Sequence, residues 1–322
     1  MKVVRILLLL LLAGAAAGAF LLFAPVTPPG ETFLDLPMGV GSSGMAQRLA
    51  AAHVVRNRYA FLLVRVWKRG SLKAGEYRFA EPASALTVYR RIQRGDVYTR
   101  AVTIPEGFNL YDIAAAVQAA GLGSGQAFLD AAHRNTDLIA AWAPGASSLE
   151  GYLYPETYLF SRHATPRSMQ EAMVRRFRTA MLKLGVSGDS GRLVTLASLV
   201  EKEVRFDDER GLAAGVFENR LRVGMPLQTD PTVIYTALLA GQWSGAIHRS
   251  DLHRDSPYNT YMHSGLPPGP ICSPGMAALR AALHPAATPN LYFVADGAGH
   301  TQFSADLKAH AAQVDAYRKT QR

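Results

Sequence analysis

The sequence predicts a mixed α/β (α+β) protein in which an N-terminal membrane helix precedes about two folded domains. The length of 322 residues indicates about two domains, since a domain holds roughly 150 residues. Residues 6–24 predict the membrane helix, because they form an apolar run without a charged residue. After this run, short β-prone segments alternate with helical patterns, which is typical of a chain that contains both kinds of element.

The composition is that of an ordinary globular chain, with 49% hydrophobic residues, 28 glycines and 18 prolines. It excludes wholesale disorder and collagen-like architectures. The 34 Lys and Arg residues exceed the 25 Asp and Glu residues and leave a net charge of +9, which fits nucleic acid, anionic lipid or an acidic polymer as a partner. The single cysteine, Cys272, excludes an intramolecular disulfide framework and a Cys-rich metal site.

The apolar run of residues 6–24 is 19 residues long, and as a helix it comes close to crossing a bilayer core of about 30 Å. Lys2 and Arg5 precede it, so the positive-inside rule leaves residues 1–5 in the cytoplasm as a short tail. Residues 25–31, which contain three prolines, then form a linker. The sequence thus predicts a single-pass protein of the cytoplasmic (inner) membrane whose folded part lies on the periplasmic, extracytoplasmic side.

A cleaved signal peptide is the alternative, because residues 15–19 are all alanine or glycine and offer small-residue cleavage patterns. The apolar run continues through residues 20–23, which a cleavage site does not need, and this favours an uncleaved anchor that contacts membrane lipid. An exported protein meets anionic lipid and cell-wall polymers before it meets nucleic acid. The sequence also contains no zinc-finger, RNP-type or Walker motif, so we expect no nucleic-acid partner.

A weak internal repeat lies in the first half of the chain. Residues 37–39 and residues 105–107 both read Pro-x-Gly, and apolar residues follow nine and twelve positions after each proline. Each copy predicts a strand, a turn and a helix, an arrangement that suits a small binding module. A chance match of a few positions is the alternative.

The best candidate for chemistry lies at the end of an apolar segment, residues 193–200, which predicts a buried helix. This segment runs directly into Glu201, Lys202 and Glu203. Glu203 continues the apolar stripe of the helix at spacings of three, four and seven residues. A partly desolvated carboxyl group near a helix C-terminus keeps its proton to higher pH, as a general acid requires. A solvated helix end without chemistry is the alternative.

Three later loops, residues 224–235, 256–261 and 265–270, combine turn prolines with amide, hydroxyl and aromatic groups. Such groups can bind sugar hydroxyls, but helix capping by Thr229 or Asp230 and turn formation explain part of the pattern without a ligand. We expect no metal and no cofactor. The histidines do not form a His-Glu-x-x-His motif, and the Gly-x-Ser-x-Gly motif and a nucleotide-binding glycine loop are missing from the sequence.

Six motifs together resemble, in sequence and in order, those of the MltG (YceG-like) endolytic murein transglycosylases. They lie at residues 196–203, 216–221, 227–235, 258–261, 265–271 and 291–295. The resemblance extends to the N-terminal anchor and to the segments at residues 73–77, 150–152 and 155–158. One departure is Cys272, which occupies a position where a small residue without a thiol is more usual and is not expected to touch the mechanism.

The resemblance implies a LysM-like peptidoglycan-binding region at residues 32–160 and a C-terminal α/β YceG-like catalytic domain at residues 161–322. It places the catalytic glutamate in the Glu-Lys-Glu motif. We align this residue with Glu203, in agreement with the helical phase, and keep Glu201 as the second choice. Candidates to hold sugars or to orient the acid are Gln228, Thr229, Asn259 and Tyr261.

The implied reaction cleaves the MurNAc-β-1,4-GlcNAc bond inside nascent glycan strands, leaves 1,6-anhydro-MurNAc ends and so terminates elongation. Glu203 would protonate the leaving oxygen and then accept the proton of the muramyl 6-hydroxyl, which attacks its own anomeric carbon. Because the substrate supplies the nucleophile, the second carboxylate of ordinary glycosidases is not needed.

The implied partners are peptidoglycan strands, together with penicillin-binding proteins and other cell-wall synthesis proteins. The alternative function is a membrane-tethered scaffold that binds peptidoglycan for synthetic enzymes without cleaving it.

Overall fold

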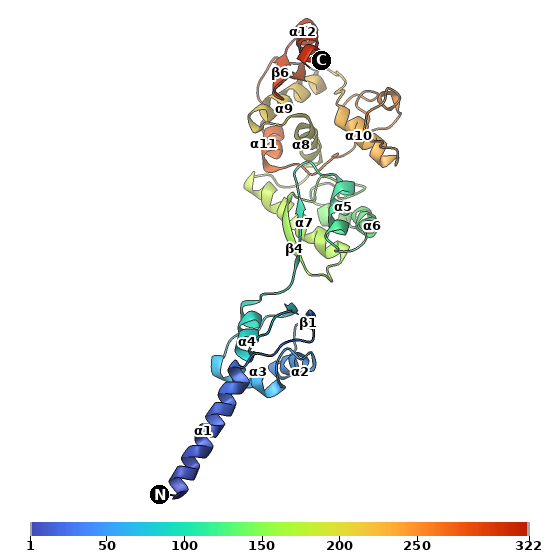
Figure 1. Ribbon diagram of the computed structural model, residues 1–322. Helices are drawn as coiled ribbons and strands as arrows, with labels where there is room; N and C mark the ends of the chain where they lie inside the picture. The colour runs from blue at the N-terminus through green and yellow to red at the C-terminus, as the bar shows by residue number, and fades with distance from the viewer. Residues whose placement is uncertain (1, 321–322) are drawn as a thin grey trace. The chain divides into compact units, whose positions relative to one another are not determined.

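The computed structural model describes residues 2–320, and its chain forms two compact units, Met1–Thr99 and Arg100–Arg322 (Figure 1). Each unit has its own hydrophobic core. The first unit contains α1 (Lys2–Phe23), β1 (Thr32–Leu36), α2 (Ser42–Ala51), α3 (Arg58–Lys68), β2 (Gly75–Phe79) and α4 (Ala85–Arg94).

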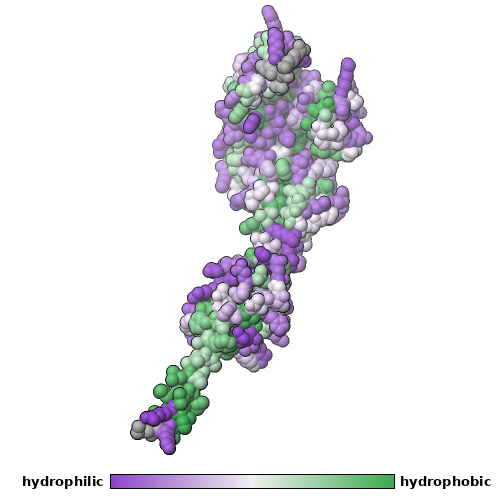
Figure 2. All heavy atoms as spheres, in the orientation of Figure 1, coloured by the Kyte–Doolittle hydropathy of each residue, from purple (hydrophilic) through white to green (hydrophobic). Residues whose placement is uncertain are grey.

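Helix α1 contains the apolar run predicted to cross a membrane. None of its residues is buried, and its apolar side chains form a continuous hydrophobic surface (Figure 2). Among residues 2–320, α1 is the one helix that is long and apolar enough to cross a membrane. This observation is consistent with N-terminal membrane anchoring.

The rest of the first unit has a β-α-α-β order completed by α4. Strand β1 pairs antiparallel with β2, from Thr32 opposite Phe79 to Leu36 opposite Gly75. The core under this strand pair is formed by fully buried side chains, including Leu49, Phe61, Tyr77 and Tyr89. Helix α4 begins at the N-cap Ser84, whose hydroxyl accepts the amide of Thr87, and ends at Gly95 in the left-handed region.

The second unit begins with β3 (Arg100–Ile104), α5 (Leu110–Ala119), α6 (Gly125–Arg134), the 3-10 turn η1 (Thr136–Ile139) and β4 (Glu156–Phe160). It continues with α7 (Pro166–Lys183), α8 (Gly191–Glu203), α9 (Asp207–Arg222), α10 (Asp230–Leu239) and η2 (Asp251–His253). The last elements are α11 (Met276–Leu283), β5 (Tyr292–Ala295), β6 (Thr301–Ser304) and α12 (Leu307–Thr320). Strands β3 and β4 form one antiparallel pair, and β5 and β6 form another.

The internal repeat is structural. Residues 32–79 and residues 100–160 both run strand, helix, helix, strand, with the two strands paired antiparallel. The turn glycines Gly39 and Gly107 have φ values of 83° and 79°, a backbone conformation that glycine adopts without a steric penalty. The strand, turn and helix predicted for each copy are therefore confirmed, and a chance match without a structural counterpart is wrong.

The border between the two units differs from the expected one. We expected the first folded region to end at residue 160, but the units meet between Thr99 and Arg100. The reason is that residues 100–160 share a core with the C-terminal part of the chain, in which Val102 and Tyr158 cluster with Met173 and Leu199. The second β-α-α-β segment is thus an integral part of the unit that carries the Glu-Lys-Glu motif.

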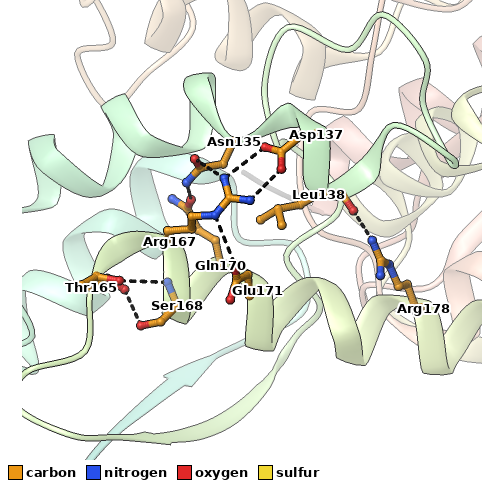
Figure 3. Close-up of polar contacts among 9 residues, drawn as sticks. All are labelled: Asn135, Asp137, Leu138, Thr165, Arg167, Ser168, Gln170, Glu171 and Arg178. Atoms are coloured by element: carbon orange, nitrogen blue, oxygen red, sulfur yellow. Dashed lines mark hydrogen bonds and ion pairs between the residues drawn. The ribbon is translucent and has the colours of Figure 1, made fainter.

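Polar contacts attach α7 to this second β-α-α-β segment (Figure 3). Arg167 forms an ion pair with Asp137 at 2.7 Å and donates a hydrogen bond to the Asn135 side chain. The fully buried Gln170 accepts a hydrogen bond from Asn135 at 2.7 Å and donates one to the carbonyl of Phe128 at 2.9 Å. These bonds satisfy polar groups at the end of α6 that packing against α7 would otherwise desolvate.

Candidate active site

Helix α8 positions the Glu-Lys-Glu motif at its last turn. Residues 194–200 of this helix are all buried, so between its first turn and its end the helix is embedded in the second unit. Glu201 and Glu203 lie two positions apart, a spacing that points side chains to opposite sides of a helix. The two carboxyl groups therefore have different surroundings.

Glu201 is part of a buried ion pair. One of its carboxylate oxygens lies 3.0 Å from Nη1 of Arg210 on α9, and both side chains are at most 7% exposed. Its other oxygen accepts the amide of Gly275, the N-cap of α11, at 2.9 Å. Glu201 therefore joins α8 to α9 and α11, and its charge is compensated within the protein.

Glu203 is partly exposed, and no ion pair involves it among residues 2–320. Burial of the carboxyl group raises its pKa to about 7, and the negative charge of Asp230 acts in the same direction. The Thr229 side chain and the positive charge of Arg220 lower the pKa but do not offset burial. Near neutral pH, a large fraction of Glu203 therefore carries a proton that it can donate.

The loop before α10 brings Gln228 and Thr229 to this carboxyl group. Gln228 has a φ of 49° in the left-handed region, an uncommon backbone conformation for a residue with a side chain, and its amide donates to the carbonyl of Thr260 at 3.1 Å. Its side chain is exposed. Such strained residues concentrate at functional sites because the surrounding structure must hold them in place.

Thr229 is 2% exposed, and its amide donates to the hydroxyl of Thr260 at 3.0 Å. It occupies the N-cap position of α10 but makes no side-chain capping bond. Its buried hydroxyl has no hydrogen-bond partner of ordinary length in the described part of the chain. Because this hydroxyl lowers the pKa of Glu203, it is directed at the carboxyl group and not at the helix end.

Asn259 has a different position from the one expected of a sugar ligand. It is fully buried, and its side-chain amide donates to the carbonyls of Asp251, Leu252 and Arg254 at 2.9–3.2 Å. Its side-chain oxygen accepts the amide of Tyr261 at 3.0 Å. All these partners are backbone groups, so Asn259 holds the loop in shape and positions Tyr261.

Tyr261 reaches the site through Asp230. Its hydroxyl donates to the carboxylate of Asp230 at 2.7 Å, and burial together with this bond raises the pKa of Tyr261. Asp230 is the residue whose charge raises the pKa of Glu203. The structure thus brings Thr229 and Tyr261 to the surroundings of Glu203, with the Gln228 backbone beside them.

The sequence analysis assigned no role to Arg220, although it lies in one of the six motifs. Arg220 is buried and donates hydrogen bonds to the carbonyls of Leu291 at 2.6 Å and Leu227 at 2.7 Å. Its guanidinium lies 5.5 Å from the centre of the Tyr292 ring. It is the cation whose charge lowers the pKa of Glu203. A buried arginine next to a titrating carboxyl group can stabilise the carboxylate form.

Glu150 is a second buried carboxyl group with a pKa raised to about 7 by burial. It is 3% exposed, and its oxygens accept the Tyr235 hydroxyl and the amides of Leu110 and Gly151 at 3.0–3.2 Å. These bonds join the start of α5 to α10. The Glu150 carboxyl group is thus held by three hydrogen bonds that connect structural elements. No hydrogen bonds of this kind are made by Glu203 among residues 2–320.

A pocket of about 480 Å³ lies beside the N-terminal half of α8. Its wall includes Thr195 of α8, Tyr258 of the loop that also carries Tyr261, and the proline-rich residues 266–270. Thr195 precedes Glu203 by eight residues, a separation of about 12 Å along a helix. The Tyr258 ring, with its centre 5.1 Å from that of Tyr235, provides an aromatic surface in this wall.

Two other expectations concern cysteine and metals. Cys272 is fully buried, its thiol lies 3.3 Å from the carbonyl of Ser198, and burial raises its pKa, so it is not placed to react. In residues 2–320, no three His, Cys, Asp or Glu side chains are grouped so that they could hold a metal ion.

Comparisons with known proteins all lead to one family. The YceG-like family model matches residues 34–316. A Bacillus subtilis (strain 168) protein named endolytic murein transglycosylase is 33% identical over 329 aligned residues, which cover 93% of this chain and 90% of that protein. A Streptococcus pneumoniae (serotype 2, strain D39) protein of the same name is 31% identical over 82% of this chain, which spans only 54% of that longer protein. The crystal structure of a yceG-like protein from Listeria monocytogenes matches with a TM-score of 0.58 and 31% identity, covering 88% of this chain and 98% of that one.

Proposed function

Because the chain belongs to the YceG-like family, we propose that it is an endolytic murein transglycosylase that cleaves peptidoglycan strands internally. The names of its relatives at 31–33% identity support this activity. The observation that carries it in this chain is Glu203, a residue of intermediate exposure whose carboxyl pKa is raised by burial to about 7 beside a loop of polar side chains.

In the proposed reaction, Glu203 donates its proton to the glycosidic oxygen as the bond from that oxygen to the muramyl anomeric carbon breaks. The resulting carboxylate then accepts the proton of the muramyl 6-hydroxyl, whose oxygen forms the new bond to the anomeric carbon. The products are a free GlcNAc 4-hydroxyl and a 1,6-anhydro-MurNAc end, and Glu203 regains its proton. Arg220 lowers the pKa of Glu203 and so stabilises the intermediate carboxylate. The scheme needs no cofactor, since acid, base and nucleophile come from one side chain and the substrate.

We assign the loops around Glu203 to substrate binding. The exposed Gln228 side chain is proposed to bond a sugar, while the buried Thr229 hydroxyl orients the Glu203 carboxyl group. The Tyr261–Asp230 pair contributes further polar groups to this site. The pocket with Tyr258 in its wall begins about 12 Å along α8. Asn259 positions this loop and does not contact the sugar.

We further propose that α1 spans the cytoplasmic membrane with residues 1–5 inside the cell, so that residues after the 25–31 linker act on nascent strands outside it. The β-α-α-β part of the first unit, residues 32–79, is proposed as the LysM-like peptidoglycan-binding region. Cleavage of nascent strands at this location would terminate their elongation next to penicillin-binding proteins and other synthesis enzymes, which are proposed partners.

Mass spectrometry of the muropeptides released from purified peptidoglycan tests the proposed activity. We expect new 1,6-anhydro-MurNAc ends inside strands. Reducing ends in their place would show that water is the nucleophile and would contradict a transglycosylase. Binding to sacculi without any new ends would favour the non-enzymatic scaffold.

A further inference from the structure

We propose that the exposed face of α3 lies in the headgroup layer of the membrane that α1 spans, and that it holds the first unit against the outer surface of the bilayer. This inference rests on the proposed membrane span of α1. It adds a second membrane contact, made by a helix that does not cross the bilayer. The ligand is a lipid surface that contains anionic headgroups.

Helix α3 is apolar on two sides. One side packs into the core of the first unit through the buried residues Ala60, Phe61 and Val64. The other side carries large exposed residues at helical spacing, namely Tyr59 (57% exposed), Leu63 (47%), Val66 (69%) and Trp67 (54%). A helix on the surface of a water-soluble unit normally presents polar residues on this second side. This apolar stripe therefore fits a surrounding other than water.

Contacts with α1 place this stripe next to the membrane helix. The Trp67 ring meets the Phe23 ring edge-on, with 6.4 Å between the ring centres. The guanidinium of Arg56, just before α3, lies 4.5 Å from the centre of the Phe20 ring. Leu21 and Leu22 pack against the core of the first unit. The last turn of α1 is therefore in contact with the rest of the first unit.

The length of α1 determines where this last turn lies. The apolar run of 19 residues is about 29 Å long as a helix, and the hydrocarbon core of a bilayer is about 30 Å thick. The run has no length to spare, so its last turn, with Phe20 and Phe23, must lie at the outer boundary of the hydrocarbon. Trp67, which touches Phe23, then lies at the same level, where tryptophan and tyrosine are enriched in membrane proteins.

The charge around α3 matches a membrane surface. Residues 36–75 contain seven Lys and Arg residues and no Asp or Glu. Four of these basic residues lie in α3 or directly after it: Arg58, Arg65, Lys68 and Arg69. Apolar residues flanked by basic ones are typical of helices that lie in the plane of the interface and bind anionic lipid. Figure 2 shows the hydrophobic surface of α1 continuing onto the adjoining part of the first unit.

The consequence concerns the substrate. With α3 in the headgroup layer, the first unit stays at the membrane surface and does not move freely at the end of a linker. The proposed peptidoglycan-binding region would then meet glycan strands close to the point where they leave the membrane.

Depth-dependent quenching of Trp67 fluorescence tests the proposal in the full-length protein. The chain has three tryptophans, so the variant Trp142→Phe/Trp243→Phe leaves Trp67 as the sole reporter. The protein is reconstituted into phosphatidylcholine vesicles that contain phosphatidylglycerol, with lipids brominated either near the headgroup or near the chain end. We expect strong quenching by the first kind of lipid and weak quenching by the second. The matched control is Trp67→Phe/Trp243→Phe, whose Trp142 lies in the core of the second unit and should not respond.

A Leu12→Trp variant without the other tryptophans tests the membrane span of α1 separately from the position of α3. If this residue is quenched by the deep lipid but Trp67 is not quenched at all, α1 spans the membrane and the inference about α3 is wrong. If the residue at position 12 is not quenched either, the span itself fails. If the protection of Trp67 from quenching depends on the protein-to-lipid ratio, a second copy of the chain covers the exposed face of α3. That result would overturn the proposal.

A second measurement avoids changes at core tryptophans. A nitroxide attached to Val66→Cys reports its depth from its accessibility to oxygen and to a water-soluble nickel complex, and the buried Cys272 does not compete for the label. The control is a label at the exposed Met38→Cys in the same vesicles. We expect the label at position 66 to be more accessible to oxygen, relative to the nickel complex, than the label at position 38. Equal accessibility at both positions would contradict the proposal.

Discussion

Glu201 and Glu203, two residues apart at the end of α8, have different electrostatic surroundings. Glu201 lies 3.0 Å from Nη1 of Arg210 in a buried ion pair, whereas Glu203 forms no ion pair among residues 2–320 and burial raises its pKa to about 7. The raised pKa leaves part of Glu203 protonated near neutral pH, and this makes it the proposed proton donor.

The first prediction concerns the pH dependence of the reaction. The first step uses protonated Glu203, and the fraction of this form falls as the pH rises through about 7. We expect kcat/KM on soluble glycan strands to decline above that pH with the slope of one titrating group. Removing the charge of Asp230 with Asp230→Asn should move this limb to lower pH, because its charge raises the pKa of Glu203. A limb that does not respond to this substitution would contradict the assignment.

The second prediction concerns stability and follows from the same pKa. The folded-state pKa of Glu203 lies above the ordinary glutamate value of 4.5, so this group favours folding below that value and loses its contribution as the pH rises through about 7. Glu203→Gln removes the cost of a buried charge. We expect its unfolding free energy to exceed that of the wild type by about 3 kcal/mol near pH 8 and to equal it at about pH 4. Denaturant unfolding at the two pH values measures this, and a difference of the opposite sign would refute it.

The third prediction separates the neighbouring carboxylate. Glu201→Gln leaves the buried Arg210 without its main counter-charge, although Asp207 remains 3.0 Å away. We expect a loss of about 3 kcal/mol in unfolding free energy. The matched control is Glu218→Gln, which breaks the exposed pair with Arg192 and should cost at most about 1 kcal/mol. Equal losses in the two variants would show that the Glu201 pair is not the structural contact described above.

The fourth prediction distinguishes the two loop residues. Asn259→Ala leaves buried carbonyls and one amide without partners, so we expect a loss of about 2–4 kcal/mol in stability. Tyr261→Phe removes only the bond to Asp230, and we expect near-normal stability with a reduced kcat. Thermal unfolding and initial rates of both variants test this division. A stable but inactive Asn259→Ala protein would return Asn259 to the list of substrate ligands.

Sequence reasoning predicted the burial of α8 correctly because its signal is local. An apolar segment that runs into Glu-Lys-Glu determines both burial and helical phase, and these already favoured Glu203. The ion pair of Glu201 was not predictable in the same way. Its partners, Arg210 and Gly275, lie on other elements, and the amide of Gly275 comes from 74 residues along the chain.

The missed features share this non-local origin. The unit border falls at residue 99 because β3 pairs with β4 across more than fifty residues, a pairing that no local pattern specifies. Asn259 looked like a ligand because its residue type suits sugars, but the fold of its loop turns the amide inward to backbone carbonyls. Nothing in the local pattern around Arg220, which lies between Asn219 and Leu221, distinguishes it from a surface arginine.

The most direct test of the central claim counts 1,6-anhydro ends made from the same purified peptidoglycan by the wild type, Glu203→Gln and Glu201→Gln. Glutamine is nearly isosteric with a protonated glutamate but can neither donate an acidic proton nor accept one. We expect Glu203→Gln to lose about 10²–10⁴ of the rate while it remains folded, and Glu201→Gln to retain activity in proportion to its folded fraction. An active Glu203→Gln beside a folded but inactive Glu201→Gln would transfer the catalytic role to Glu201 and contradict the account.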